Sequence, residues 1–139
     1  MDAISATMKI AASGLQAQSL RVRMTAENIA NANSLSASPG GDPYQRKTII
    51  FQSTLDRSSG ANLVGVRRIG VDPSEFRKIY DPSHPGADEE GYIKMPNVNP
   101  LIEMTDMREA TRSYDANLNV IEQARSMAAS TLSLLDRNR

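Results

Sequence analysis

The chain has 139 residues, enough for one modest hydrophobic core. Lysine and arginine together number 16, as do aspartate and glutamate, so the formal net charge is zero. This balance argues against nucleic acid as a partner, because binding to phosphates needs an excess of basic residues. There is no cysteine, which excludes disulfides, thiolate nucleophiles and zinc–sulfur sites. Aromatic residues make up only 4% of the chain, so we expect helices that pack through aliphatic, methionine and alanine side chains.

Proline and glycine divide the chain into three segments. Residues 1–33 contain no proline, residues 34–100 contain all seven prolines and seven of the eight glycines, and residues 101–139 contain neither. Both residue types interrupt regular structure, so the ends are predicted as helices and the middle as strands and turns. We therefore predict a mainly α fold with a small β-rich middle: two terminal helices paired as a coiled coil, and a β-hairpin-type extension between them.

The first segment has the spacing of a heptad seam, with steps that alternate between four and three residues. Alanine, glutamine and threonine occupy three of the seam positions, which makes the seam weak. Gly14 lowers the helix propensity by a further ~1 kcal/mol relative to alanine. We expect the helix to stop at the polar run that begins with Asn31, because asparagine tolerates the left-handed conformation of a helix cap. The larger seam residues, predicted to pack, are Ile4, Met8, Leu15, Val22 and Ile29.

The middle segment contains four short stretches that favour β-strands, separated by turn sequences. Its first ten residues, SLSASPGGDP, are rich in serine, proline and glycine and are predicted as a loop over 34–43. The expected strands cover residues 44–51, 62–71, 75–80 and 91–95.

The last helix is predicted to begin at Asn99 and Pro100, since asparagine is a good N-cap and proline suits the first helical position. Glu103 adds negative charge to the first turn, where it complements the helix dipole. Apolar residues again recur at near-heptad spacing, interrupted by Arg125. Such stripes form either a helical hairpin within one chain or a coiled coil between chains, and the composition is compatible with both. The residues predicted to pack are Met107, Tyr114, Leu118, Ile121, Leu132 and Leu135.

One histidine, His84, lies in the predicted turn DPSHPG. The chain offers no nucleophile elbow to accompany it and no phosphate-binding glycine-rich loop. Asp88, Glu89 and Glu90 lie nearby, but neighbouring carboxylates converge on one metal ion only in a shaped loop such as an EF-hand. We interpret all four as solvated loop residues. The sequence thus predicts no catalytic residue, no metal site, no cofactor and no small-molecule substrate.

Two stretches of sequence resemble one known family. Residues 12–33, ASGLQAQSLRVRMTAENIANAN, resemble the N-terminal signature of flagellar basal-body rod and hook-type axial proteins, and residues 107–135 resemble the C-terminal signature. Glu27 departs from the pattern, because many axial proteins have asparagine there. A longer proline- and glycine-rich loop also replaces the short element that usually follows the first signature. The matching residues are Ser13, Gly14, Leu15, Ala17, Asn28, Ile29, Ala30, Asn31, Ala32 and Asn33, followed by Arg112, Tyr114, Asn117 and Leu118.

The resemblance implies a structural, non-enzymatic subunit of the proximal rod of the bacterial flagellar basal body. Such subunits assemble into a tube that transmits torque from the motor to the hook, with the helical ends lining its inner wall. The implied partners are copies of itself, other rod proteins, and membrane-ring and export-gate components at the rod base. The rod crosses the periplasm, and the implied route there is flagellar type III export without a cleaved signal peptide.

The ends and hydropathy of the chain agree with that route. The N-terminus lacks a basic stretch followed by an apolar block, so no secretory signal peptide is predicted. No stretch approaches the length of a membrane span, so direct insertion into a membrane is not expected.

Two other interpretations stay open. Another short axial component of the rod would carry both signatures, whereas the hook and distal-rod proteins that resemble this chain are much longer. A small enzyme would need a site around His84, and loss of turnover on His84→Ala would reveal it.

Overall fold

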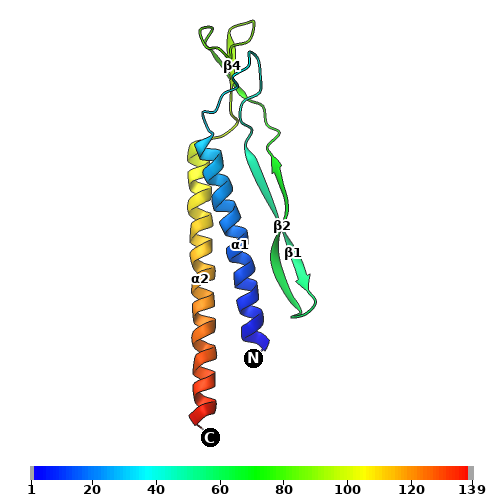
Figure 1. Ribbon diagram of the computed structural model, residues 1–139, viewed down its shortest axis with the longest axis vertical. Helices are drawn as coiled ribbons and strands as arrows, with labels where there is room; N and C mark the ends of the chain where they lie inside the picture. Colours follow the sequence, from blue (N-terminus) through cyan, green and yellow to red (C-terminus); the bar gives the residue numbers. More distant parts are fainter. Residues whose placement is uncertain (1, 138–139) are drawn as a thin grey trace. The chain divides into compact units, whose positions relative to one another are not determined.

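The computed structural model describes residues 2–137, with a long helix at each end and strands between them (Figure 1). The predicted class is confirmed at this level: two terminal helices enclose a small antiparallel strand region. Residues 1, 138 and 139, the ends of the predicted terminal segments, lie outside the described residues. The elements in chain order are α1 (Asp2–Ala30), β1 (Lys47–Asp56), β2 (Ala61–Val71), β3 (Arg77–Tyr80), β4 (Tyr92–Met95) and α2 (Pro100–Arg137).

The chain forms two compact units, which we call unit 1 and unit 2. Both helices and both strands of the β1–β2 pair contribute residues to each of them. Each unit therefore gathers an α1 segment, an α2 segment and strand residues from distant parts of the sequence. Unit 1 comprises residues 2–21, 50–68 and 109–137, and unit 2 comprises residues 22–49 and 69–108.

The C-terminal end of α1 differs from the expected left-handed cap. The helix ends at Ala30, directly before the polar run that begins with Asn31, as predicted. Among the described residues only glycines have positive φ angles, so the expected left-handed cap is not how it ends. The helix instead tightens at its end: the backbone N–H of Ala32 donates to the Ile29 carbonyl at 3.2 Å. The Asn31 side chain also donates to the Glu27 carbonyl at 2.9 Å. The Glu27 carbonyl also accepts from the Asn31 backbone N–H at 3.1 Å, so the asparagine amide adds a second hydrogen bond to a carbonyl of the last turn.

The start of α2 is as predicted. The Asn99 side-chain oxygen accepts a hydrogen bond from the backbone N–H of Leu101 at 3.0 Å, and the Asn99 carbonyl accepts one from Glu103 at 3.1 Å. Pro100 occupies the first helical position, where its missing N–H leaves no intrahelical bond unmade.

The four predicted strands all occur, with shifted bounds. β1 begins at Lys47 rather than at residue 44, because the side chains that precede it bind elsewhere in unit 2. It also runs five residues further than predicted, to Asp56, where the chain reverses. There the Asp56 carboxylate accepts hydrogen bonds from the Ser58 backbone at 3.1 Å and the Ser59 hydroxyl at 2.6 Å. The hydrogen bonds from Ser59 and Ser58 hold the pKa of the Asp56 carboxylate well below its usual range. The other three strands agree within two residues at each end.

β3 and β4 form a separate antiparallel pair in unit 2. Their register matches Arg77 with Met95 at one end and Tyr80 with Tyr92 at the other. The two tyrosine rings meet edge to face, with centroids 5.2 Å apart. Such cross-strand aromatic pairs stabilise short ribbons that lack a third strand.

The predicted loop over 34–43 is ordered against the turn that precedes β4. The backbone N–H of Gly40 donates to the Gly86 carbonyl at 3.2 Å, and that of Tyr44 donates to the Ser34 carbonyl at 3.1 Å. Gly86 is packed so closely that a Cβ there would lie 2.6 Å from the Ser36 carbonyl oxygen. Only glycine fits this contact without a shift of backbone.

We predict that Gly86→Ala lowers the free energy of unfolding by about 1–3 kcal/mol, because the new methyl group meets backbone rather than a flexible side chain. Gly65→Ala is the matched control, since its Cβ would lie 3.5 Å from the nearest atom, the Thr54 hydroxyl. Urea unfolding followed by circular dichroism measures both. Equal stability of the two variants would contradict the close contact at Gly86.

Candidate functional site

Two polar side chains, Asn28 and Glu103, are the largest fully buried ones that the structure describes. Both belong to unit 2, and the Asn28 Nδ2 donates to the Glu103 carboxylate at 3.0 Å. The same Nδ2 donates to the Lys47 carbonyl at 3.0 Å. The Asn28 Oδ1 accepts from the Lys47 backbone at 2.9 Å and from the Tyr44 hydroxyl at 2.8 Å. The carboxamide thus makes all four hydrogen bonds available to it and joins α1, α2 and the start of β1.

The Glu103 carboxylate has no exposed surface, so its charge must be balanced within the fold. The Arg46 Nε donates a hydrogen bond to it, and the same guanidinium lies 3.6 Å from both Asp72 and Asp106. Burial lowers the pKa of Arg46, but the hydrogen bond to Glu103 and the negative charges of Glu103, Asp72 and Asp106 together outweigh this effect and raise it. We call Tyr44, Arg46, Lys47, Asn28 and Glu103 the polar hub.

Tyr44 keeps its proton as a member of this hub. Burial raises its pKa, and the negative charges of Glu27 and Glu103 raise it further. Lys47 in turn forms an ion pair with Glu27. The Tyr44 hydroxyl therefore acts as a donor to Asn28 rather than as a base, which assigns it a structural role.

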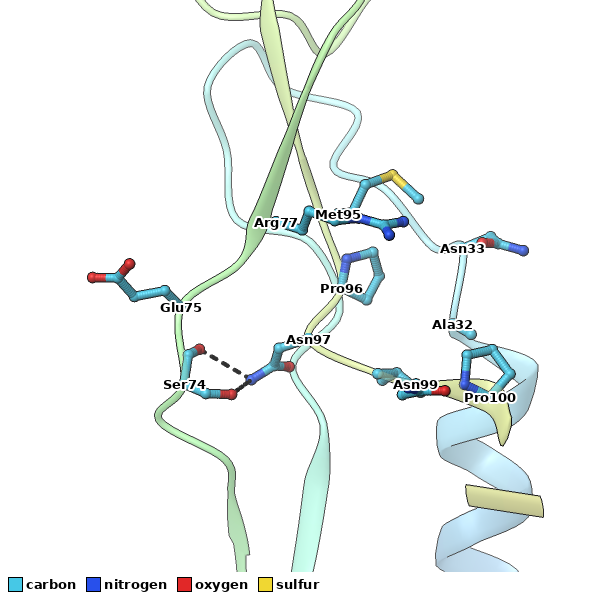
Figure 2. A pocket seen from close by; sticks show the side chains of 11 residues that line it. Ala32, Asn33, Ser74, Glu75, Arg77, Met95, Pro96, Asn97, Asn99 and Pro100 are labelled. Atoms are coloured by element: carbon cyan, nitrogen blue, oxygen red, sulfur yellow. Dashed lines mark hydrogen bonds between the residues drawn. The ribbon is translucent and has the colours of Figure 1, made fainter. Parts of the chain in front are cut away.

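A polar pocket of about 500 Å³ lies beside the hub in unit 2 (Figure 2). Asn97 lines this pocket and connects two of its segments. Its Nδ2 donates to the Ser74 carbonyl and hydroxyl, both at 3.1 Å, and its Oδ1 accepts from the Arg46 backbone N–H at 2.7 Å. In Figure 2 the Glu75 carboxylate points away from the Asn97 side chain. The lining holds no nucleophile with a neighbouring base, so the pocket has no arrangement for catalysis.

In unit 1 the two helices meet through small side chains. A Cβ on Gly14 would lie 2.8 Å from the Asn117 Nδ2, so the glycine permits a close approach of the helix backbones. The Asn117 amide is held by a hydrogen bond to the Ser113 carbonyl at 3.0 Å. Arg21 and Glu109 form an ion pair at 3.6 Å in the same unit. Other buried residues along these helix segments are Ala11, Ala17, Ala110 and Ala124.

Ser13 links α1 to β2 within unit 1. Its hydroxyl donates to the Ile10 carbonyl at 2.7 Å and accepts from the Val64 backbone N–H at 3.0 Å. Lys9 adds an ion pair with Asp56 at 3.2 Å. Serine at this position therefore gives a backbone N–H of β2 a hydrogen-bond partner on α1.

The residues predicted to pack divide by burial. All five on α1, together with Met107 and Ile121 on α2, are half-buried. Four others on α2 are exposed: Tyr114 at 36%, Leu118 at 40%, Leu132 at 54% and Leu135 at 64%. The inner face of α2 in unit 1 is formed instead by the buried or half-buried Ala110, Ser113, Asn117, Ile121 and Ala124.

The loop residues singled out by their chemistry make local contacts. His84 Nδ1 accepts a hydrogen bond from the Gly86 backbone at 3.0 Å. Asp88 is half-buried and accepts from the Tyr92 backbone at 2.8 Å, so it shapes the turn into β4, while Glu89 and Glu90 are exposed. Within residues 2–137 no group of three acidic or histidine side chains could hold a metal ion. Over the same range no helix is long and apolar enough to span a membrane.

Sequence reasoning missed the hub, because it assigned Glu103 only to the helix dipole. A signal was present: Glu103, Ala110, Asn117 and Ala124 follow one another every seven residues, and all four face inward. Arg46, 57 residues before Glu103, carries no comparable pattern.

Comparison with known proteins places both signatures in one family. The model described as "Flagella basal body rod protein" matches residues 8–34, and that described as "Flagellar basal body rod FlgEFG protein C-terminal" matches residues 89–134. The flagellar basal-body rod protein FlgC of Agrobacterium fabrum is 58% identical over 135 residues, which cover 97% of each chain. That of Salmonella typhimurium is 42% identical over 90% of this chain and 92% of its own. That of Borreliella burgdorferi is 39% identical over 93% of this chain and 95% of its own.

The chain belongs to the FlgC family of flagellar basal-body rod proteins.

It is therefore a structural subunit of the rod and not an enzyme, as the resemblance implied. Its signature residues contribute to both units. Gly14 and Asn117 meet in unit 1, and Asn28 is the centre of the hub in unit 2. Ala30, Asn33 and Arg112 are exposed on the rod subunit.

We predict that Asn28→Ala lowers the free energy of unfolding of this rod subunit by at least about 2 kcal/mol, because it leaves the buried Glu103 carboxylate and the Lys47 backbone short of partners. Asn119→Ala removes the same group from an exposed position of α2 and should change stability by less than about 0.5 kcal/mol. Urea unfolding of both purified variants provides the comparison. A loss at Asn28 no larger than at Asn119 would show that the hub does not stabilise the fold.

Proposed function

We propose that this rod subunit builds the tubular proximal rod through its terminal helices, with copies of itself and other rod proteins as neighbours. The observation that carries the proposal is the exposed apolar surface of α2 in unit 1. Leucine side chains that are more than half exposed stand there without cover from their own chain. Large apolar side chains that stay exposed in such number on one helix indicate a protein interaction site. The exposed residues are Tyr114, Leu118, Val120, Met127, Leu132, Leu134 and Leu135.

The terminal helices, within residues 1–33 and 101–139, pair in this proposal as a coiled-coil domain, and the middle residues contact neighbouring subunits. Support comes from the seven-residue spacing of inward-facing residues on α2 and from the close approach at Gly14 and Asn117. The Arg21–Glu109 ion pair flanks that approach, as charged residues flank coiled-coil seams.

The wider assignments rest on the family. We place the subunit in the part of the rod that crosses the periplasm, next to membrane-ring and export-gate components, and we assign its delivery to flagellar type III export. Torque transmission requires that each subunit resist twisting. The hydrogen bonds and ion pairs of the polar hub, which join both helices to β1 in unit 2, supply that resistance locally.

The test uses a strain that lacks this subunit and whose swimming the unchanged chain restores. The proposal predicts that the Leu118→Asp chain does not restore it. Burying a leucine stabilises a contact by roughly 1.5–3 kcal/mol, and an aspartate at the same place would bury an unpaired charge. The purified variant should keep its helical content, because Leu118 lies outside the inner face of α2. Swimming in soft agar and circular dichroism measure the two effects.

Asn119→Asp places the same charge one residue further along α2, on an exposed side chain outside the apolar surface, and should leave swimming intact. Full motility of the Leu118→Asp strain would refute the proposed surface.

A further inference from the structure

The chain has a single histidine, His84, and its ring accepts a hydrogen bond in the turn before β4. The backbone N–H of Gly86 donates to the His84 Nδ1 at 3.0 Å. This nitrogen must therefore carry a lone pair, so the ring is neutral with its proton on Nε2. In a protonated ring both nitrogens are donors. The Nδ1–H would then face the Gly86 N–H, and the hydrogen bond would be lost.

Other turns of this kind use side chains that do not gain a proton near neutral pH. Among residues 2–137, four aspartates accept a hydrogen bond from the backbone N–H two residues further on, and Asn99 does the same for Leu101 at 3.0 Å. Aspartate and asparagine stay acceptors between about pH 5 and 8, whereas histidine ordinarily titrates within that range. The His84 turn is therefore the one among these that mild acid opens. The four aspartate turns pair Asp56 with Ser58, Asp72 with Ser74, Asp81 with Ser83 and Asp88 with Glu90.

Gly86, which donates to the ring, also binds the loop over 34–43. Its carbonyl accepts a hydrogen bond from the backbone N–H of Gly40 at 3.2 Å. Gly86 is buried, and a Cβ on it would lie 2.6 Å from the Ser36 carbonyl oxygen and 3.2 Å from the His84 Nδ1. The ring and the loop thus both contact this one residue. A ring that turns away from Gly86 therefore loosens the place where the loop is held.

The Asp81 carboxylate offers a protonated ring an alternative partner. Asp81 belongs to the same turn and interacts electrostatically with His84. The hydrogen bond from the Ser83 hydroxyl lowers the pKa of Asp81, so this carboxylate is already ionised where histidine ordinarily gains its proton. Other charged side chains of the neighbouring segments are Asp42, which pairs with Lys94 of β4, Lys78 of β3, and Asp88, Glu89 and Glu90 of the turn.

We propose that His84 is a pH-sensitive switch for the 34–43 loop. The neutral ring holds residues 84–87 in the shape that binds the loop, and protonation of the ring releases the loop from them. The contact is thus complete above the pH range in which histidine titrates and weakens as the pH falls through it. The switch lies within unit 2 and goes beyond the proposed assembly of the rod, because it makes the surface formed by this loop depend on pH.

Amide hydrogen exchange, followed by NMR on the purified full chain without a polyhistidine tag, tests the switch. Exchange rates at about pH 7.5 and 5.5, roughly one unit on either side of the ordinary histidine value, are divided by the intrinsic rates at each pH. The protection of Gly40 and Gly86 should fall about three- to tenfold at the lower pH, the equilibrium equivalent of one hydrogen bond. The fall should follow the titration of the His84 ring signal. The Ser74 amide, held by Asp72, is the internal control and should keep its protection.

Two variants separate the ring from the carboxylates around it. His84→Asn keeps a neutral acceptor, as Asn99 does for Leu101, and should hold Gly40 equally well at both pH values. His84→Ala has no acceptor and should show at the higher pH the low protection that the unchanged chain shows at the lower one. The inference is overturned if Gly40 in the unchanged chain is equally protected at both pH values. It is also overturned if His84→Asn loses as much protection in acid as the unchanged chain, or if His84→Ala loses none. These results leave the proposed rod function standing, since that proposal does not involve His84.

Discussion

A carboxylate with no access to water, that of Glu103, constrains much of unit 2. An unpaired charge in that position would cost several kcal/mol, so the surrounding chain must supply both hydrogen bonds and a positive charge. Asn28 supplies a hydrogen bond from α1, and Arg46 supplies the charge from the segment before β1. Arg46 is held in turn by Asp72, Asp106 and Asn97. The path of residues 44–46 follows from these demands, which is why these residues lie outside the strand that they were expected to begin.

The packing of unit 1 depends on the size of the side chains between its helices rather than on their charge. Gly14 allows α1 to come so close to Asn117 that the inner face of α2 accommodates mainly small side chains. The large apolar side chains of α2 are consequently displaced to the flanks and remain exposed. A monomeric protein would bury its leucines first and leave its alanines outside. The reversed distribution is what a subunit needs if its neighbours complete the burial.

Local sequence patterns predicted the local structure well. The heptad spacing predicted both helices, and Asn99 with Pro100 predicted the first turn of α2, because capping involves only neighbouring residues. The packing face of α2 was harder to predict. The most apolar stripe runs along Leu118 and Leu132, whereas the inner face follows Ala110, Asn117 and Ala124. Hydrophobicity identifies what needs burial but not which chain buries it. The polar hub could not be read locally, because Glu103 and its partners Arg46 and Asn28 are 57 and 75 residues apart.

A double-mutant cycle shows whether Glu103 and Arg46 stabilise unit 2 as a coupled pair. Glu103→Leu, Arg46→Leu and the double variant are compared with the unchanged chain by urea unfolding. Each single variant leaves one charge without its partner, whereas the double variant removes both charges. We expect the double variant to lose less stability than the sum of the single losses, by more than about 1 kcal/mol. Losses that add to within about 0.5 kcal/mol would contradict this coupling.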